Sequence, residues 1–246
     1  MQIDIQFLPS LPDRSLLTDR IVVVIDVLRA TSVMVHAMLQ GALEIIPVAS
    51  VDEAFQMAKV FPRGFVLLGG ERESKNIPGF DLGNSPKEYV AERVKGKKLI
   101  LTTTNGTRAF HVVSSGKEIL AGSFFNIGAV AQRCLESNRD LFIFPSGDEG
   151  EFSLEDTICG GMLIDLITKK GQKPIPLTDA SYAAQILYKR FETNLLEAFH
   201  LSRHGKELTD RGFGEDLAYC AQTDITDIVP IFRDGVIRIE RMQKAE

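Results

Sequence analysis

Polar clusters that could bind a phosphate or a metal ion follow several apolar segments of this chain. The first cluster begins at Asp26, directly after the apolar run Ile21–Ile25, and continues to Ser32. Asp26 could bind Mg²⁺, because hard cations prefer carboxylate oxygens. Arg29 could bind a phosphate or sulfonate through paired N–H donors, and Thr31 stands at a helix start, where free backbone donors attract anions. The alternative is that Asp26 or Thr31 simply caps the helix.

A second group of candidates lies in two short loops, one with paired glycines and the other before a helix. Gly69–Glu73 places Glu71, a candidate metal ligand, beside Arg72, a candidate phosphate ligand. The alternative is a solvated turn with a surface ion pair. Asn84 and Ser85 precede a predicted helix, and a loop that caps a helix can also present N–H groups to an anion.

The segment Thr102–Thr107 is a third polar loop, and it also follows a predicted strand. It is rich in hydroxyl, amide and backbone donors, which favours a phosphate cradle made by Thr103, Thr104, Asn105 and Gly106. It is not a P-loop, because the Walker A pattern occurs nowhere in the chain. The alternative is a strand end that happens to be rich in threonine.

Acidic residues at a further helix start could complete the site. Ser146 and Gly147 could extend the anion cradle, while Glu155 and Asp156 could hold a metal ion or orient a water. The alternative is that the two acids only interact favourably with the helix dipole. Cys159 is interpreted as a buried structural thiol rather than a nucleophile.

The histidines and the late acids carry weaker signals. His200 and His204 could share a helix face, but no Glu adjoins His200 as in an HExxH motif, which disfavours a zinc site. The segment Ser202–Gly205 could still contribute an anion-binding side chain. The late acids are interpreted as surface residues or helix caps: Asp216, Asp224 and Asp227.

Alternating strands and helices must position these loops, and they predict a three-layer α/β/α fold with a mostly parallel or mixed sheet. Strands are expected at 3–7, 21–25, 44–48, 65–68, 98–102, 118–121, 141–145 and 234–241. Helices are expected at 31–40, 50–60, 86–94, 107–113, 126–137 and 154–169, with a mostly helical portion from 178 to 220. We expect one domain over 1–246, with two lobes (178–246 mostly helical) as the alternative. Ligands of such sheets bind at the carboxyl ends of the strands, so the polar loops should meet at one edge.

Composition excludes several classes of protein. The net charge of −5 disfavours binding to nucleic acid. Three cysteines without a CxxC pair disfavour disulfides and structural zinc, and favour a reducing compartment. The longest apolar run is too short to span a membrane, and the first residues do not resemble a secretory leader. We therefore expect a cytoplasmic protein with no membrane partner.

Taken together, the clusters resemble the 2-phosphosulfolactate phosphatase family. The resemblance rests on DVLRATS at 26–32, GGER at 69–72, GNSP at 83–86, TTTNGT at 102–107, the stretch 146–156, SRHG at 202–205 and the acidic stretch 214–216. It implies a Mg²⁺-dependent hydrolase that converts 2-phospho-3-sulfolactate to 3-sulfolactate and phosphate, a step toward coenzyme M in methanogens. Other members of such a family could act on another small phosphorylated acid.

The expected mechanism places Asp26, Glu155 and Asp156 at the reaction, with Asp26, Glu71 and Asp156 as candidate Mg²⁺ ligands. Asp26 could instead attack phosphorus and form an aspartyl-phosphate, and the sequence does not choose between this route and an activated water. The alternatives are a non-catalytic binding protein for a small anion and a phosphoryl transferase. A homodimer is the default assembly, because symmetric pairs are the commonest oligomers.

Overall fold

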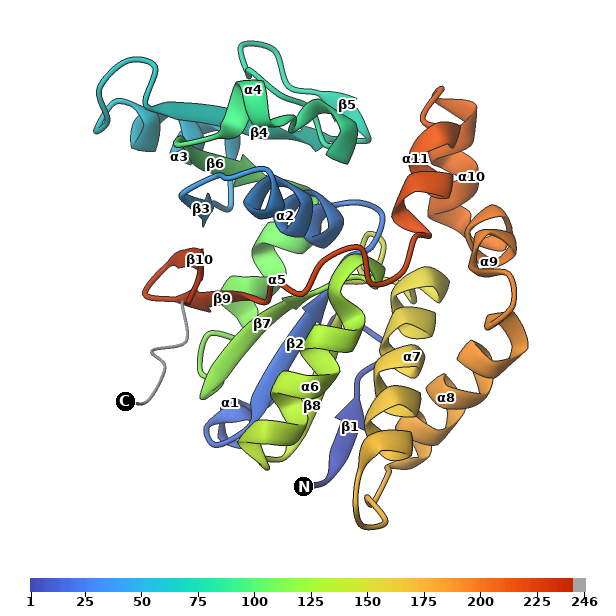
Figure 1. Ribbon diagram of the computed structural model, residues 1–246. Helices are drawn as coiled ribbons and strands as arrows, with labels where there is room; N and C mark the ends of the chain where they lie inside the picture. The colour runs from blue at the N-terminus through green and yellow to red at the C-terminus, as the bar shows by residue number, and fades with distance from the viewer. Residues whose placement is uncertain (241–246) are drawn as a thin grey trace.

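A ten-stranded sheet organises the protein over residues 1–240, which are the residues that the computed structural model describes (Figure 1). The strand order is β1-β8-β2-β7-β9-β10-β3-β6-β4-β5. The strands are β1 Ile3–Ile5, β2 Ile21–Ile25, β3 Glu44–Pro47, β4 Val66–Arg72, β5 Lys75–Asn76, β6 Lys98–Thr102, β7 Glu118–Gly122, β8 Leu141–Pro145, β9 Pro230–Arg233 and β10 Val236–Ile239. Arg241, the last residue of the predicted 234–241 strand, lies outside the described residues.

The sheet contains two parallel blocks that run in opposite directions. We call β1, β8, β2 and β7 the first block, and β3, β6 and β4 the second block; all neighbours within each block pair in parallel. The β9–β10 hairpin joins them, because β9 pairs antiparallel with β7 and β10 pairs antiparallel with β3. Three successive antiparallel pairings reverse the strand direction from one block to the other. The expectation that all polar loops meet at one edge of a parallel sheet is therefore wrong for the sheet as a whole.

Helices cover both faces of each block, and two of them, α2 and α5, pack against both blocks. The helices are α1 Arg14–Leu17, α2 Ala30–Leu39, α3 Val51–Ala58, α4 Ala91–Val94, α5 Gly106–Val112, α6 Ile127–Ser137, α7 Leu154–Lys170, α8 Asp179–Phe191, α9 Leu195–Leu201, α10 Arg203–Asp210 and α11 Gly214–Cys220. Figure 1 shows α2 and α5 between the two blocks, with α6 and α7 on the far face of the first. The predicted three-layer α/β architecture is confirmed.

The core explains why the central strand is so apolar. All five residues of β2 are fully buried, because the strand has neighbours on both sides and helices on both faces. Ile21, Val23 and Ile25 pack in the core under α6 and α7, whereas Val22 and Val24 pack in the core around α2 and α5. A strand buried in this way delivers the residue that follows it, Asp26, into the interior.

The C-terminal portion is helical as predicted, from α8 to α11. Helix α8 packs along α7, and α10 and α11 lie beyond the carboxyl end of the first block (Figure 1). No helix within residues 1–240 has the length and apolar character that a membrane span requires. The division into one domain or two lobes stays a prediction.

Local differences from the sequence prediction have identifiable causes. The predicted helix 86–94 is instead a 3₁₀ turn, η1 (Pro86–Glu88), and the short helix α4, separated by Tyr89 and Val90. The break occurs because the buried Tyr89 turns inward and its hydroxyl donates to the carbonyl of Gly83 at 2.7 Å. Strand β9 was not predicted: its tetrapeptide starts with a proline and is too short for a periodic signal.

Candidate active site

Asp26 is positioned by the first turn of α2 and by the end of β2. Its Oδ1 accepts a hydrogen bond from the Ala30 amide at 3.0 Å, and the hydroxyl of Thr31 bonds both the amide and the carbonyl of Asp26. The side chain is 7% exposed. Burial raises the pKa of this carboxyl, although the Ala30 amide acts in the opposite direction. Asp26 therefore both caps the start of α2, as the alternative prediction had it, and provides a buried carboxyl group.

Asp156 lies beside Asp26 although 130 residues separate them along the chain. It stands in the first turn of α7, which Ser153 caps, and its Oδ1 accepts from the Val27 amide at 2.8 Å. The side chain is 2% exposed. Burial raises its pKa well above the ordinary value, and the negative charges of Asp26 and Glu155 raise it further. Two neighbouring carboxylates repel each other, and a bound cation would remove this repulsion.

Glu155 faces a different neighbourhood from Asp156. It is 3% exposed, and burial raises its pKa. His204 and the hydroxyl of Ser202 lower that pKa, while the charge of Asp148 raises it, which places Glu155 toward α10.

The 103–106 loop of the second block contacts Asp26 at Gly106. A Cβ on Gly106 would lie 2.5 Å from Asp26 Oδ2, so the absence of a side chain permits this contact between the blocks. Beside it, the Thr104 amide donates to Glu71 Oε1 at 2.8 Å, and the Ser74 amide donates to Glu71 Oε2 at 2.8 Å. The two blocks point their carboxyl ends at each other around α2 and α5, and this arrangement brings together loops that a flat sheet would separate.

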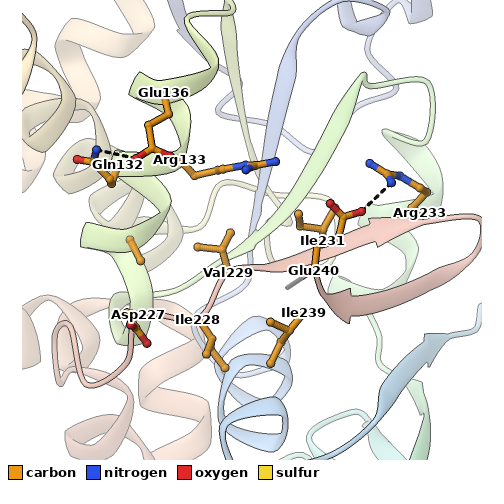
Figure 2. Close-up of a pocket in the computed structure, with 11 residues that line it drawn as sticks. Gln132, Arg133, Glu136, Asp227, Ile228, Val229, Ile231, Arg233, Ile239 and Glu240 are labelled. Carbon is orange, nitrogen blue, oxygen red and sulfur yellow. Dashed lines mark hydrogen bonds and ion pairs between the residues drawn. The ribbon is translucent and has the colours of Figure 1, made fainter. Parts of the chain in front are cut away.

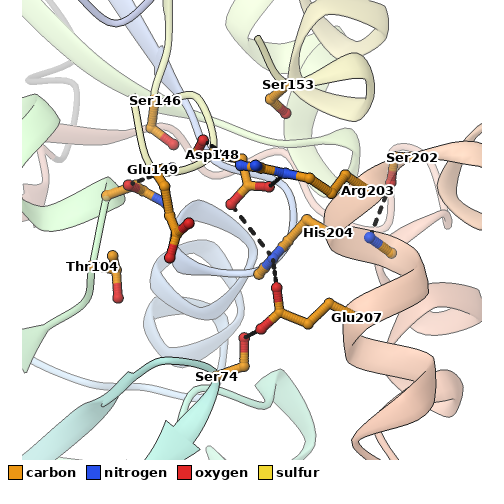
Figure 3. A network of polar contacts seen from close by, with 12 residues as sticks. Ser74, Thr104, Ser146, Asp148, Glu149, Ser153, Ser202, Arg203, His204 and Glu207 are labelled. Carbon is orange, nitrogen blue, oxygen red and sulfur yellow. Dashed lines mark hydrogen bonds and ion pairs between the residues drawn. The ribbon is translucent and has the colours of Figure 1, made fainter. Parts of the chain in front are cut away.

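Helix α10 borders the site on the side that neither block covers (Figure 3). Arg203 donates from Nε to Asp148 Oδ2 and from Nη2 to the Asp148 carbonyl, both at 2.7 Å. His204 Nδ1 lies 3.8 Å from Asp148 Oδ1 and 4.0 Å from Glu207 Oε2, and it is buried without a hydrogen-bond partner among the described residues. Glu207 in turn accepts from the Ser74 hydroxyl at 3.1 Å, which links α10 to the second block.

Several predicted ligand-binding side chains are already occupied within the protein. The hydroxyls of Thr31 and Thr103 are buried and bonded to nearby backbone, and Thr103 exchanges bonds with Thr107. Arg72 donates from Nη1 to the Glu71 carbonyl and from Nη2 to the Thr102 hydroxyl, both at 2.7 Å. These residues shape the loops, and their polar groups are not directed to a ligand in this state.

Arg29 is part of a buried network with an acid that the sequence analysis placed at the surface. Its Nη1 donates to Asp216 Oδ2 at 2.6 Å, both side chains are under 5% exposed, and Ser85 donates to Asp216 Oδ1 at 2.7 Å. Asp216 is therefore neither a surface acid nor a cap, and that interpretation was wrong. Arg29 Nε and Asn84 Oδ1 are buried and lack hydrogen-bond partners among residues 1–240.

The remaining cradle residues lie beside the acid pair. Ser146 lies at the end of β8, and its hydroxyl is 3.5 Å from Asp156 Oδ2. Gly147 has a φ of 69°, a conformation that favours glycine, and it turns the chain into the loop that carries Asp148. Asn105 Oδ1 accepts from the Glu149 amide in that same loop at 3.3 Å.

The donor set fits a hard divalent cation that also binds substrate oxygens. The described residues hold no group of three His, Cys, Asp or Glu side chains close enough to form a metal site. Mg²⁺ commonly binds through one or two carboxylates together with substrate phosphate and water, and Asp26 with Asp156 supplies that number. Both oxygens of Glu71 already accept hydrogen bonds, so Glu71 fits a positioning role better than a ligand role.

A larger groove lies elsewhere on the described structure. It has a volume of about 1070 Å³ and lies between α6 and the β9–β10 hairpin (Figure 2). Its charged side chains include Arg133, which pairs with Glu118, and Arg233, which pairs with Glu240. None of the predicted site residues lines it, and it lacks a buried cluster of acids. We therefore take the Asp26–Asp156 region as the candidate active site.

Comparison with known proteins supports the same conclusion about the family. The family model described as 2-phosphosulpholactate phosphatase matches residues 7–235. The chain belongs to this family. It is therefore an enzyme of the phosphoric monoester hydrolase class, as predicted.

Similar members of the 2-phosphosulpholactate phosphatase family come from several bacteria. A probable 2-phosphosulfolactate phosphatase of Caldanaerobacter subterraneus subsp. tengcongensis is 44% identical over 229 residues, which cover 93% of this chain and 94% of that protein. Proteins of the same description from Clostridium tetani and Symbiobacterium thermophilum are 42% and 38% identical, and the matches cover 89% and 93% of this chain and 92% and 97% of those proteins. The similarity thus extends over nearly the whole chain.

Sequence reasoning on this phosphatase missed several residues at the site. Asp148 and Glu207 were given no role, and His204 was noted only within a segment that could bind an anion. These residues could not be found one at a time, because the role of Arg203 and His204 depends on their contact with Asp148. That contact is visible only once α10 is known to face the loop after β8. The ordered segment SRHG at 202–205 was the one usable clue, because Ser202 caps α10 and fixes the direction of the next two side chains.

Proposed function

We propose that this protein hydrolyses 2-phosphosulfolactate to 3-sulfolactate and phosphate in a Mg²⁺-dependent reaction. The observation that carries the proposal is the buried pair Asp26 and Asp156, in which the charge of Asp26 raises the pKa of Asp156, at the place where the loop after β2, the 103–106 loop and the start of α7 meet. The similarity to proteins named probable 2-phosphosulfolactate phosphatase supports the choice of substrate.

Each residue of the candidate active site would have a separate role in the reaction. Asp26 and Asp156 would hold the ion, which supplies neutralising charge to the phosphoryl oxygens. Ser146 would orient the phosphate beside the acids, and Glu71 would hold Thr104 in place. Such positioning and charge stabilisation account for most of the catalysis of phosphate-monoester hydrolysis.

Two chemical routes are compatible with this arrangement. Asp26 could attack phosphorus with its Oδ2 and break the ester P–O bond, so that 3-sulfolactate leaves with a proton from solvent water. Water would then attack the phosphorus of the aspartyl-phosphate, releasing phosphate and regenerating the Asp26 carboxylate. Alternatively, a water could attack phosphorus directly, with the carboxylates of the site as its orienting groups. The configuration at a phosphorus made chiral with oxygen isotopes would separate the routes, since two in-line displacements through an aspartyl-phosphate retain it and one direct displacement by water inverts it.

The test of the proposed function is phosphate release over a panel of small phosphorylated acids, with and without Mg²⁺. We expect release from 2-phosphosulfolactate that stops in EDTA and returns with Mg²⁺. Asp26→Asn serves as the inactive reference, because the amide can still accept from the Ala30 amide and preserve the fold. Absence of phosphate release from every ester by the wild-type protein would reject the proposal and would favour a protein that only binds or transfers the anion.

The remaining parts of the proposal concern cell biology and assembly. A cytoplasmic location is supported by three cysteines that are all free and buried, as is usual for proteins of reducing compartments. A role on the route to coenzyme M is inherited from the family resemblance alone. A homodimer is proposed as the default assembly, and light scattering on the purified protein tests it.

A further inference from the structure

The arginines nearest to the candidate active site are mostly occupied by partners within the protein. Arg29 is paired with the buried Asp216, and Arg203 with Asp148. Arg72 binds a carbonyl and the Thr102 hydroxyl. The proposed substrate carries a carboxylate and a sulfonate in addition to the phosphate, so its recognition requires positive charge that these three side chains have largely committed elsewhere.

Arg108 is the arginine of this region that has neither an ion pair nor a side-chain hydrogen bond among residues 1–240. It lies in the first turn of α5, and its side chain is exposed. It also lies close to Arg72: burial lowers the pKa of Arg72, the charge of Glu71 raises it, and the positive charge of Arg108 lowers it again. Glu71 offsets the repulsion between the two arginines at Arg72, whereas an anion bound beside Arg108 would offset it at Arg108.

A cavity of about 190 Å³ adjoins Arg108 and opens beside the catalytic loops. Its polar lining comes from the loop after β6 and the loop after β8, and consists of Thr104, Asn105, Arg108 and Ser146. Because the Asn105 Oδ1 accepts from the Glu149 amide, its NH₂ group is left as a donor without a partner among the described residues. Figure 3 shows Thr104 and Ser146 on either side of Glu149.

The cavity adjoins the acid pair through Ser146. Ser146, which lines the cavity, has its hydroxyl 3.5 Å from Asp156 Oδ2, and Thr104 bonds to Glu71. A substrate whose phosphate lies against Asp26 and Asp156 would therefore extend its other end past Ser146 toward Arg108. The donors at that end, an arginine fork and a primary amide, match a tetrahedral group with three acceptor oxygens.

We propose that Arg108 is a specificity-determining residue that binds the sulfonate of the substrate in this cavity, with the amide of Asn105 as the second donor. The proposal rests on the proposed function and extends it by assigning the non-phosphate end of the substrate. Arg108 does not take part in bond breaking at phosphorus. Its loss should therefore change the affinity for substrates that carry the sulfonate, and leave the chemistry of phosphate release in place.

The experiment compares Arg108→Ala, Arg108→Lys and the control Arg63→Ala on three substrates. Arg63 is also exposed and lacks an ion pair within the described residues, but it lies before β4, away from the site. The substrates are 2-phosphosulfolactate, 2-phospholactate, which has a methyl group in place of the sulfonate-bearing carbon, and p-nitrophenyl phosphate. Binding of 3-sulfolactate to each Mg²⁺-loaded protein is measured in parallel by calorimetry.

We expect Arg108→Ala to raise KM for 2-phosphosulfolactate and Kd for 3-sulfolactate by about 10- to 100-fold, the effect of one lost charged hydrogen-bonding group. Changes in kcat should be small, and the two substrates without a sulfonate should be affected little. Arg108→Lys should recover part of the affinity, because the ammonium keeps the charge but not the fork. Arg63→Ala should behave as the wild type.

Three results would overturn the proposal. The first is an equal loss on all three substrates, which would assign Arg108 to the phosphate or to the fold. The second is an equal loss on 2-phosphosulfolactate and 2-phospholactate alone, which would assign it to the carboxylate. The third is unchanged KM and Kd. If the wild-type protein released no phosphate, the proposed function would fail, while 3-sulfolactate binding by wild type and Arg108→Ala would still decide on the subsite.

Discussion

The two strand blocks contribute different kinds of residue to the candidate active site. The first block and its helices supply Asp26, Glu155 and Asp156, which are buried acids with raised pKa values. The second block supplies Glu71 and the 103–106 loop, whose polar groups are mostly bonded to one another. The difference indicates that the first block carries the charge that the reaction uses, and the second block provides a rigid partner surface. This division of roles predicts larger effects of mutations in the first block than in the second.

The largest effect should come from removing charge in the first block. Asp26→Asn and Asp156→Asn should each reduce Mg²⁺-dependent kcat by about 10³-fold or more, because each removes a carboxylate that the ion needs. Glu71→Gln, in the second block, should cause a clearly smaller loss, since the amide oxygen can still accept from the Thr104 amide. Steady-state kinetics on the three variants measures the contrast, and equal losses would remove the division between the blocks.

The next largest effect concerns the link between the two regions at Asp216, which bonds both Arg29 and Ser85. Asp216→Ala should lower the free energy of unfolding by about 3–5 kcal/mol, because it leaves the buried Arg29 charge unpaired. Its neighbour Glu215 makes an exposed pair with Lys87, so Glu215→Ala is the matched control and should change stability little. Urea unfolding decides the matter, and similar effects for the two variants would contradict the buried pair.

A smaller effect should follow from pushing the two blocks apart at their contact. In Gly106→Ala the new methyl group would meet Asp26 Oδ2, and we expect kcat/KM to fall by about 10- to 100-fold with a stability loss of about 1–3 kcal/mol. Gly214→Ala is the control, since a Cβ there comes no closer than 3.7 Å to a neighbour. Wild-type kinetics in Gly106→Ala would mean that the 103–106 loop does not need to approach Asp26.

The smallest effect is a dependence of stability on pH in EDTA. The raised pKa of Asp156 means that the folded state binds its proton more tightly than the unfolded state, whose pKa is near 3.8. This contribution to stability is complete below that pH and is lost as the pH rises through the folded-state pKa. The stability of Asp156→Asn relative to wild type should therefore improve from about pH 5 to about pH 8. A difference that stays constant with pH would reject the raised pKa, and Mg²⁺ should reduce the difference.

The sequence predicted the local elements better than their mutual arrangement. The run 21–25 and the capped helix starts at 50 and 153 carry their own signals, because burial on two sides and N-cap chemistry depend on nearby residues. Asp26 was selected because it directly follows a buried strand, and Asp156 because it lies at the start of a helix after a glycine-rich loop. The reversed second block, the buried Asp216 and the helix α10 over Asp148 could not be predicted, since they depend on pairings between residues far apart in the chain.

The β9–β10 hairpin has a consequence for how the protein is made. Its strands pair with β7 and β3, whose residues are translated more than a hundred positions earlier. Until residues 230–239 leave the ribosome, a nascent chain can form two sheets with bare edges at β7 and β3 but not one continuous sheet. Open strand edges of this kind pair readily with other chains, so the growing polypeptide is most prone to aggregate in the interval before the hairpin is added.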